Sequence, residues 1–102
     1  MGIFTIFKSN RISDRVQELV REQALIIDVR TVEEYAVEHI VGSVNIPLGT
    51  ISGKLDELRA QERPVVTCCR SGARSRMAAE QLCGEGIDAE NGGSWSSLKG
   101  FM

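Results

Sequence analysis

Two short, continuous apolar runs predict the buried strands of a parallel sheet. Residues 24–29 read Ala-Leu-Ile-Ile-Asp-Val, and residues 65–68, which follow Pro64, read Val-Val-Thr-Cys. Strands that are covered on both faces carry such uninterrupted runs, whereas strands with one face in solvent alternate between apolar and polar residues. Residues 44–46 and 87–90 predict two further short strands.

Apolar positions spaced three or four residues apart predict helices between and after these strands. Ser13 is a predicted N-cap, Thr31 and Glu34 form a predicted capping box, and Ser52 is the predicted cap of the next helix. A longer helix is predicted from Ser75 onward. The predicted apolar faces are Val16, Leu19 and Val20; Ile51, Leu55 and Leu58; Ala79, Leu82 and Cys83; and Trp95, Leu98 and Phe101.

Strands that alternate with helices predict one α/β domain, with a mostly parallel central sheet and helices on both faces. Gly84 and Gly86 predict the end of the helix after the second long strand, and residues 91–93, Asn-Gly-Gly, predict a turn. We expect residues 24–102 to form the domain. Residues 1–23 are expected to be an N-terminal segment and a helix that packs on it.

Size and charge exclude several classes of protein. A chain of 102 residues suffices for one domain. A net charge of −2 does not suggest a nucleic-acid binder. The sequence has neither a membrane span of about 20 apolar residues nor a visible signal peptide, so we expect a cytoplasmic protein. The apolar residues near the start are expected to dock on the domain, with a membrane surface or a partner as the alternative; they are Ile3, Phe4, Ile6 and Phe7.

The three cysteines are expected to be free thiols. Their odd number and the adjacency of Cys68 and Cys69 fit neither a disulfide framework nor a pair of zinc ligands. His39 is the single histidine and has no further ligand at a suitable spacing, so it is predicted to be a hydrogen-bonded structural residue. We therefore expect neither a metal nor another cofactor.

The segment from Cys69 to Ser75, between a strand and a helix, carries the candidate chemistry. Ligands of parallel sheets bind beyond the carboxyl ends of the strands. The following helix and the successive loop amides favour a thiolate, which is the reactive form of cysteine. Arginines at 70, 74 and 76 add positive charge. Cys69 is the predicted nucleophile, and the predicted substrate-binding residues are Arg70, Ser71, Gly72, Ala73, Arg74 and Ser75.

Gly72 allows a tight turn and a close approach of the backbone to a ligand. The hydroxyl groups of Ser71 and Ser75 can donate hydrogen bonds to an anion. The alternative is an ordinary loop with an incidental cysteine and solvated arginines. The combination of cysteine, glycine and two arginines at the start of a helix favours the functional interpretation.

The loop resembles the active-site signature of the rhodanese family. Three further segments resemble the family's patterns, and the resemblance spans about residues 24–101; the segments are Ile27-Asp28-Val29-Arg30 with Glu34-Tyr35, His39 to Pro47, and Asn91-Gly92-Gly93 with Trp95. It implies a persulfide on Cys69 and transfer of sulfane sulfur from thiosulfate or a similar donor to cyanide or a thiol. Cys68, Glu38 and Ser43 depart from the residues common in the family.

Two alternatives to this function stay open. Counted from Cys68, Arg74 completes a C-x5-R pattern, which resembles cysteine-dependent phosphatases. Gly72 lies three positions after Cys69, as both families prefer, and Cys68 continues the apolar strand, so Cys69 is favoured. The second alternative is a module that carries sulfur to a partner protein, or only binds, without free turnover.

Three other residues have predicted roles outside the loop. Asp28 is expected to pair with Arg30 or to accept from loop amides, rather than to act as a general base. Cys83 is expected to fill the core, with a role as a resolving thiol for Cys69 as the alternative. Trp95 either walls the pocket or seals the core.

Overall fold

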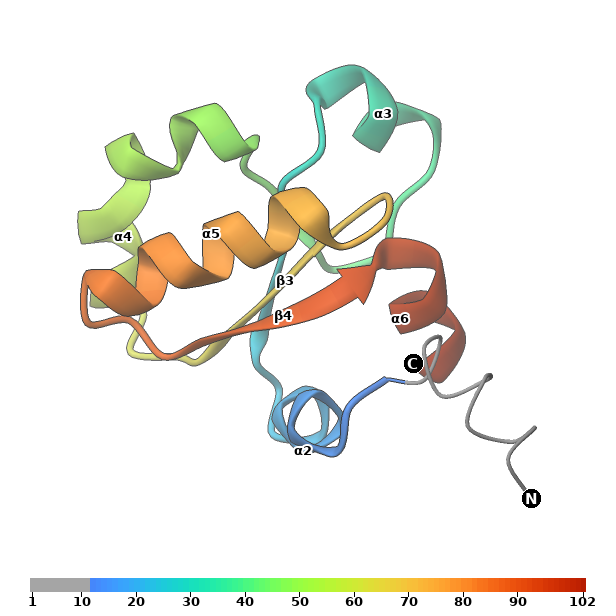
Figure 1. The fold of residues 1–102 in the computed structure, drawn as a ribbon, viewed down its shortest axis with the longest axis horizontal. Coiled ribbons are helices and arrows are strands. Elements are labelled where there is room, and N and C mark those ends of the chain that lie inside the picture. Colours follow the sequence, from blue (N-terminus) through green and yellow to red (C-terminus); the bar gives the residue numbers. More distant parts are fainter. Residues whose placement is uncertain (1–11) are drawn as a thin grey trace.

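The computed structural model describes residues 12–102, so the predictions for Ile3, Phe4, Ile6 and Phe7 lie outside the described residues. The described chain alternates helices and strands (Figure 1). Its elements are α2 (Asp14–Arg21), β1 (Leu25–Asp28), α3 (Val32–Val37), β2 (Val44–Asn45), the 3-10 helix η2 (Leu48–Lys54), α4 (Leu55–Ala60), β3 (Val65–Cys69), α5 (Ala73–Gly84), β4 (Ala89–Ser94) and α6 (Trp95–Phe101).

The four strands form one parallel sheet in the order β2-β1-β3-β4. One apolar cluster joins the sheet to η2, α4 and α5, and a second joins its other face to α2 and α6 (Figure 1). The predicted α/β class, with a mostly parallel sheet and helices on both faces, is confirmed. The buried runs of β1 and β3 form the two central strands, which explains why neither alternates with polar residues.

The pleat of β3 places the two adjacent cysteines on opposite faces of the sheet. Cys69 belongs to the cluster beneath α5, whereas Cys68 belongs to the cluster beneath α2 and α6. Successive side chains of a strand point to opposite faces, so this separation follows directly from their adjacency in the sequence. Only one of the two thiols can therefore face the loop that leads into α5.

Local capping fixes two of the predicted helix starts. The Ser13 hydroxyl accepts from the amide of Val16 at 3.2 Å, and Thr31 and Glu34 form the predicted reciprocal capping box. The cap predicted at Ser52 is wrong. Ser52 lies inside η2, and α4 begins at Leu55, because the chain continues from the 3-10 helix directly into the α-helix.

The turn predicted at Asn91-Gly92-Gly93 is also wrong, because β4 runs through these residues. An added Cβ on Gly92 would lie 2.6 Å from Cγ1 of Val66 and 2.8 Å from the carbonyl oxygen of Thr67. The glycine therefore serves a close approach of two strands rather than a turn. Tertiary pairing with β3 has overridden the local preference of the sequence.

This contact predicts that Gly92→Ala destabilises the domain by about 1–3 kcal/mol, since a methyl group there overlaps a neighbouring backbone. The free energy of unfolding, measured by urea denaturation, is the readout. Gly53→Ala is the matched control, because an added Cβ at Gly53 meets no atom within 4 Å. Equal stability of the two variants would contradict the packing argument.

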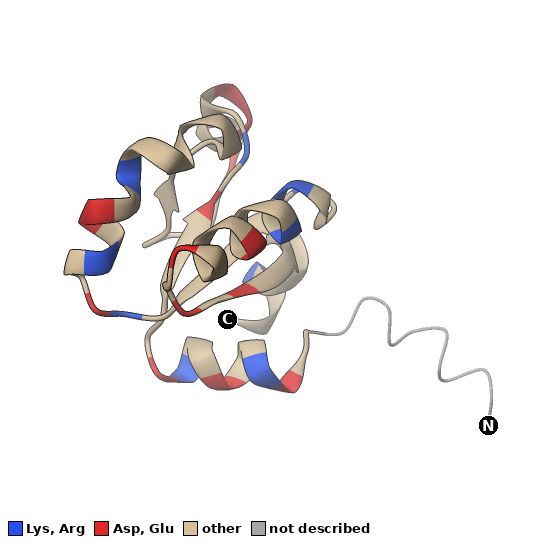
Figure 2. Ribbon diagram, turned by 60° about the vertical axis from the view of Figure 1, so that its left-hand side comes forward, with Lys and Arg blue, Asp and Glu red and all other residues tan. Residues whose placement is uncertain are grey.

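Acidic and basic residues follow one another along α2 and α4 (Figure 2). Arg15 pairs with Glu18, and Arg59 pairs with Asp56 and with Glu85. The charges of these helices thus compensate one another locally, in keeping with the small net charge of the chain. Within residues 12–102, no helix is both long and apolar enough to cross a bilayer.

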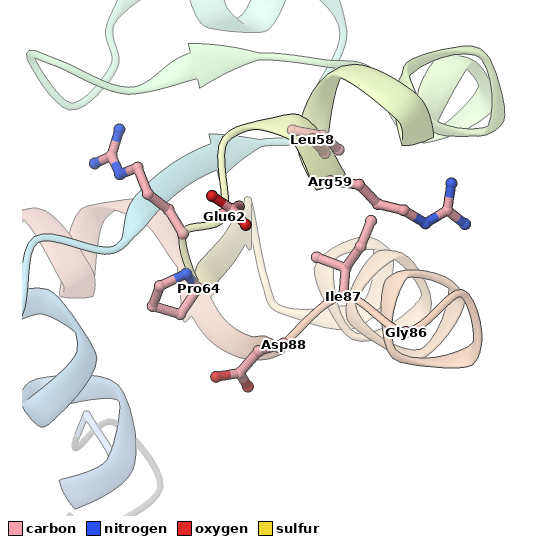
Figure 3. A pocket seen from close by; sticks show the side chains of 8 residues that line it. Leu58, Arg59, Glu62, Pro64, Gly86, Ile87 and Asp88 are labelled. Carbon is pink, nitrogen blue, oxygen red and sulfur yellow. The ribbon is translucent and has the colours of Figure 1, made fainter.

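A pocket of about 420 Å³ lies beside the segments that lead into β3 and β4 (Figure 3). Cys69 is the last residue of β3, so the pocket lies at the opposite end of the sheet. Pro64 and Asp88, which directly precede β3 and β4, form part of its wall, together with Leu58 and Ile87. Parallel α/β sheets bind ligands at the carboxyl ends of their strands, and this pocket lies at the amino ends. Its size alone therefore does not make it the reaction site.

Candidate active site

The predicted loop lies at the carboxyl end of β3, where the strand passes into α5. Cys69 is the last residue of the strand, Gly72 is the N-cap of α5, and Ala73 is its first residue, two positions before the predicted start. Gly72 has φ +105°, a conformation that favours glycine. An added Cβ at Gly72 would lie 3.4 Å from Cα of Gly93 on β4. The loop is therefore short and packed against the neighbouring strand (Figure 1).

Hydrogen-bond donors surround the sulfur of Cys69. The amide of Gly72 donates to Sγ at 3.0 Å, and the amide and hydroxyl of Ser75 each lie 3.4 Å from it. Burial raises the pKa of the Cys69 thiol, but these donors and the Ser71 amide outweigh it, so that the pKa lies below its ordinary value. The site thus favours a thiolate on a residue that is only 1% exposed.

Cys68 has the opposite environment. Its side chain is fully buried on the other face of the sheet, and burial, followed by the charge of Asp28, raises the pKa of its thiol to about 12. A thiol of this kind is inert at neutral pH. The geometry therefore favours Cys69 over Cys68 and argues against a C-x5-R loop that would begin at Cys68.

The loop arginines divide into one paired and two exposed side chains. Arg74 makes two contacts with the carboxylate of Glu34 on α3, at 2.8 and 3.1 Å. Arg70 and Arg76 are exposed, and no side chain of residues 12–102 pairs with them. Arg70 is therefore free to contact a ligand, whereas Arg74 holds the start of α5 against α3.

The contact between Glu34 and Arg74 was not predicted from the sequence. The capping-box pattern predicted a local role for Glu34, and that role is present as well. The hydrogen bond from Arg74, followed by that from the Thr31 amide, lowers the pKa of Glu34 from 4.5 to about 2. Nothing in the spacing of two residues 40 positions apart could have indicated this pairing.

This shift predicts an acid-sensitive component of stability. A carboxyl group whose pKa is lowered in the folded state stabilises it above the unfolded pKa of about 4.5. The stabilisation is lost as the pH falls from there toward 2. The difference in urea midpoint between wild type and Glu34→Gln should therefore be larger at pH 7 than at pH 3.

Glu33→Gln, an exposed neighbour on the same helical turn, is the control. Its midpoint at pH 7 should lie close to that of the wild type, because Glu33 is exposed and does not contact Arg74. A difference for Glu34→Gln that does not change between pH 7 and pH 3 would contradict the assignment of the pairing with Arg74.

Asp28 pairs with Arg30, as predicted. Nε of Arg30 lies 2.9 and 3.0 Å from the two carboxylate oxygens and Nη2 lies 2.7 Å from Oδ2, with both residues buried. The guanidinium also donates to the carbonyl of Glu38 at 2.8 Å. Its Cζ lies 4.7 Å from the centroid of the Trp95 ring, over which it stacks. This pairing fixes α3 and α6 relative to the sheet rather than presenting a free carboxylate to the loop.

The ring of Trp95 takes part in both of its predicted roles. It packs against the apolar cluster beneath α2 and α6, and it lines an open pocket beside the loop. This pocket has a volume of about 260 Å³, and its other walls are Arg30, Glu34, Val37 and Arg70. A basic, partly apolar depression therefore adjoins the exposed Arg70.

His39 is structural, as expected. Its Nδ1 lies 2.7 Å from the carbonyl oxygen of Tyr35, and the two rings stack with centroids 3.8 Å apart. The hydroxyl of Tyr35 in turn donates to the carbonyl of Ser43 at 2.7 Å. The part of the chain that the structure describes holds no group of three His, Cys, Asp or Glu side chains that could bind a metal ion.

The expectation that Cys83 fills the core is wrong. The buried stripe of α5 runs along Ser75, Ala78, Ala79 and Leu82, and Cys83 lies on its exposed flank. Its thiol donates to the carbonyl of Ala89 at 3.2 Å. Cys83 is ten residues beyond the start of α5, about 15 Å along the helix axis, which is too far for a disulfide with Cys69 in this fold.

Two polar residues, Thr67 and Asn91, hold the loop in place, although the sequence assigned neither of them this role. Thr67 donates from its buried hydroxyl to the carbonyl of Ser75 at 2.7 Å. Asn91 donates to the carbonyl of Gly72 at 3.1 Å and accepts from the hydroxyl of Ser75 at 2.6 Å. Thr67 was hidden in an apolar strand and Asn91 in an apparent turn, so neither carried a signal of its own.

Comparison with known proteins points to one family. The model of the rhodanese-like domain matches residues 13–99. The Bacillus subtilis protein YrkF, provisionally named a sulfur carrier, is 42% identical over 66 residues, covering 65% of this chain and 35% of its own. The thiosulfate sulfurtransferase GlpE of Pseudomonas fluorescens is 35% identical over 80 residues, covering 76% and 71% of the two chains.

The fold comparison agrees. The solved structure described as a rhodanese with anions from E. coli superposes with a TM-score of 0.66 at 32% identity, over 72% of this chain and 89% of that one. The chain spans 35%, 47% and 30% of the length of the first three curated relatives that it matches. The family model covers most of the chain and the fold superposes on a solved rhodanese, so the chain belongs to the rhodanese-like domain family.

Proposed function

We propose that this domain is a sulfurtransferase in which Cys69 carries sulfur as a persulfide. The observation that supports this most directly is the set of donors within hydrogen-bond reach of the Cys69 sulfur, namely the amides of Gly72 and Ser75 and the hydroxyl of Ser75. Such donors stabilise a negatively charged sulfur, which is needed both for attack on a donor and for storage of a persulfide anion. The relatives named as a sulfurtransferase and a sulfur carrier are consistent with this chemistry.

In the first step, the thiolate of Cys69 attacks the outer sulfur of thiosulfate. The S–S bond of thiosulfate breaks, its electron pair leaves with sulfite, and the outer sulfur stays on Cys69 as Cys69–S–S⁻. The exposed Arg70 would attract the dianionic donor and the departing sulfite. The amides of Ser71, Gly72 and Ser75 would support the persulfide charge.

In the second step, cyanide or a thiolate attacks the outer sulfur of the persulfide. The bond between the two sulfurs breaks, and its electron pair returns to Cys69 as the thiolate. With cyanide the product is thiocyanate, so every atom of the donor is accounted for by sulfite and thiocyanate. This cycle uses no cofactor, and the free thiol it needs suits a reducing compartment such as the cytoplasm.

The other proposed binding residues act mainly through their backbone. Gly72 and Ala73 allow the loop to enter α5 closely around the sulfur, and Ser75 contributes both an amide and a hydroxyl. Arg74 maintains the position of α5 through Glu34 and adds positive charge near Cys69. We propose these residues, with Arg70 and Ser71, as the substrate-binding loop.

A carrier role is the second candidate, because one relative is provisionally named a sulfur carrier. In that case the same persulfide forms, but its physiological acceptor is a thiol of a partner protein rather than a small molecule. The open pocket lined by Arg70 and Trp95 offers room beside the loop for an extended acceptor group. Rapid sulfur loss to a protein thiol with slow turnover of cyanide would favour this role.

The test is intact-mass spectrometry of the protein after incubation with thiosulfate, followed by addition of cyanide. We expect a gain of one sulfur, about 32 Da, that disappears as thiocyanate is released. Failure to gain sulfur from thiosulfate or from an organic persulfide would refute the proposal. Hydrolysis of an aryl phosphate by the same preparation, if Cys68→Ala abolished it, would support the phosphatase alternative instead.

A further inference from the structure

Asn91, on β4, bonds to the cysteine loop through both ends of its side-chain amide. Its Nδ2 donates to the carbonyl of Gly72 at 3.1 Å, and its Oδ1 accepts from the amide of Gly93 at 2.9 Å and from the hydroxyl of Ser75 at 2.6 Å. Turning the amide over would set both backbone contacts against like groups. The orientation that faces Oδ1 toward Ser75 is therefore fixed by two independent hydrogen bonds.

The hydroxyl of Ser75 has one proton and three acceptors within reach. Oδ1 of Asn91 lies at 2.6 Å, the carbonyl oxygen of Gly72 at 3.2 Å, and Sγ of Cys69 at 3.4 Å. A hydroxyl donates only one hydrogen bond at a time, and the distance to Asn91 is the shortest of the three. While the proton points at Asn91, the Cys69 sulfur retains only its backbone donors.

We propose that Asn91 is a positioning residue that competes with the Cys69 sulfur for the proton of the Ser75 hydroxyl. The thiolate of Cys69 accepts a hydrogen bond from the Ser75 hydroxyl only when that hydroxyl no longer donates to Asn91. Asn91 thus sets how strongly the loop stabilises the thiolate. The inference rests on the proposed function only in taking Cys69 as the reacting residue.

The charged groups around Cys69 leave this competition intact. On α5, Arg74 interacts with the sulfur and is itself held by Glu34 of α3. On β1, Asp28 is paired with Arg30, and the neighbouring Cys68 on β3 is fully buried. None of these groups contacts the hydroxyl of Ser75, so substitutions at Asn91 and Ser75 change the local hydrogen bonding without removing a charge.

A double-mutant cycle tests the proposal with Asn91→Leu, Ser75→Ala and their combination. The exposed thiol of Cys83 is removed in all proteins by Cys83→Ser. The rate of Cys69 alkylation by iodoacetamide is followed against pH by peptide mass spectrometry. Asn91→Leu frees the Ser75 proton for the thiolate, which is charged and therefore a stronger acceptor than the Gly72 carbonyl. The pH at which the alkylation rate reaches half of its maximum (the midpoint) should therefore fall by about one unit.

In the Ser75→Ala background, Asn91→Leu should leave the midpoint unchanged, because no hydroxyl proton remains to be released. Equal shifts in both backgrounds, or a higher midpoint caused by Asn91→Leu, would overturn the proposal. Circular dichroism reports whether the variants fold. If Asn91→Leu does not fold, Asn91→Asp replaces it.

The carboxylate of Asn91→Asp attracts the Ser75 proton more strongly than an amide does. It should therefore raise the midpoint by more with Ser75 present than in the Ser75→Ala background, and equal increases would overturn the proposal. These readouts do not depend on sulfur transfer. A protein that shows the coupling but forms no persulfide would retain the inference about Asn91 while refuting the proposed function.

Discussion

Replacing Cys69 with serine is expected to abolish persulfide formation and to lower thiocyanate production at least a thousandfold, to the background rate. Serine keeps the size and the hydrogen bonds of the loop, but a hydroxyl is not deprotonated at neutral pH by these donors. The variant therefore has no thiolate at position 69 that could attack thiosulfate. Production of thiocyanate from thiosulfate and cyanide measures the rate, and intact mass measures the bound sulfur.

Cys68→Ala and Cys83→Ser are the controls for this prediction. Cys68 is fully buried on the opposite face of the sheet, and Cys83 lies about 15 Å along α5 from the loop. Both variants should retain the gain of one sulfur and most of the turnover. If Cys69→Ser still acquires sulfur while either control loses it, the assignment of the nucleophile is wrong.

The largest effect on stability is expected from Asp28→Ala, which should lower the free energy of unfolding by about 3–5 kcal/mol. The substitution leaves the guanidinium of Arg30 buried without its carboxylate. The partners that remain to Arg30 are the carbonyl oxygens of Glu34 and Glu38 and the ring of Trp95, and none of them carries a compensating charge. Urea denaturation, monitored by circular dichroism, provides the measurement.

Two comparisons make this prediction specific. Asp56→Ala removes an exposed partner of Arg59 and should cost less than about 1 kcal/mol, because water screens surface pairs. The combined variant Asp28→Leu with Arg30→Met removes both buried charges and should recover part of the stability lost by Asp28→Ala. A cost for Asp28→Ala no greater than that for Asp56→Ala would show that the buried pair contributes little.

The sequence was most informative where structure depends on near neighbours. The uninterrupted apolar runs of β1 and β3, the caps at Ser13 and Thr31, and the helix after the cysteine loop were all predicted and are present. Each depends on periodicity or on hydrogen bonds that span about four residues. Cys69 could be selected in the same way, because a strand end, a glycine and a helix start lie together in the chain.

The exposure of Cys83 shows where such local reasoning stops. Helical spacing placed it beside Leu82 on the apolar face, although the buried stripe of α5 ends at Leu82. Similarly, the segment around Gly92 has the composition of a turn, but close packing of Gly92 against Val66 and Thr67 keeps the segment in a strand. In both cases the sheet decided the outcome, because it determines which side of each element meets another surface.

The sequence by itself determined the α/β architecture, the position of the cysteine loop and the preference for Cys69 over Cys68. Only the tertiary structure decided which groups control that loop: Glu34 pairs with Arg74 across 40 residues, and Asn91 bonds to Gly72 and Ser75 from another strand. Propensity and capping act within a few residues, whereas these contacts exist only because the parallel sheet brings the ends of distant segments to one edge.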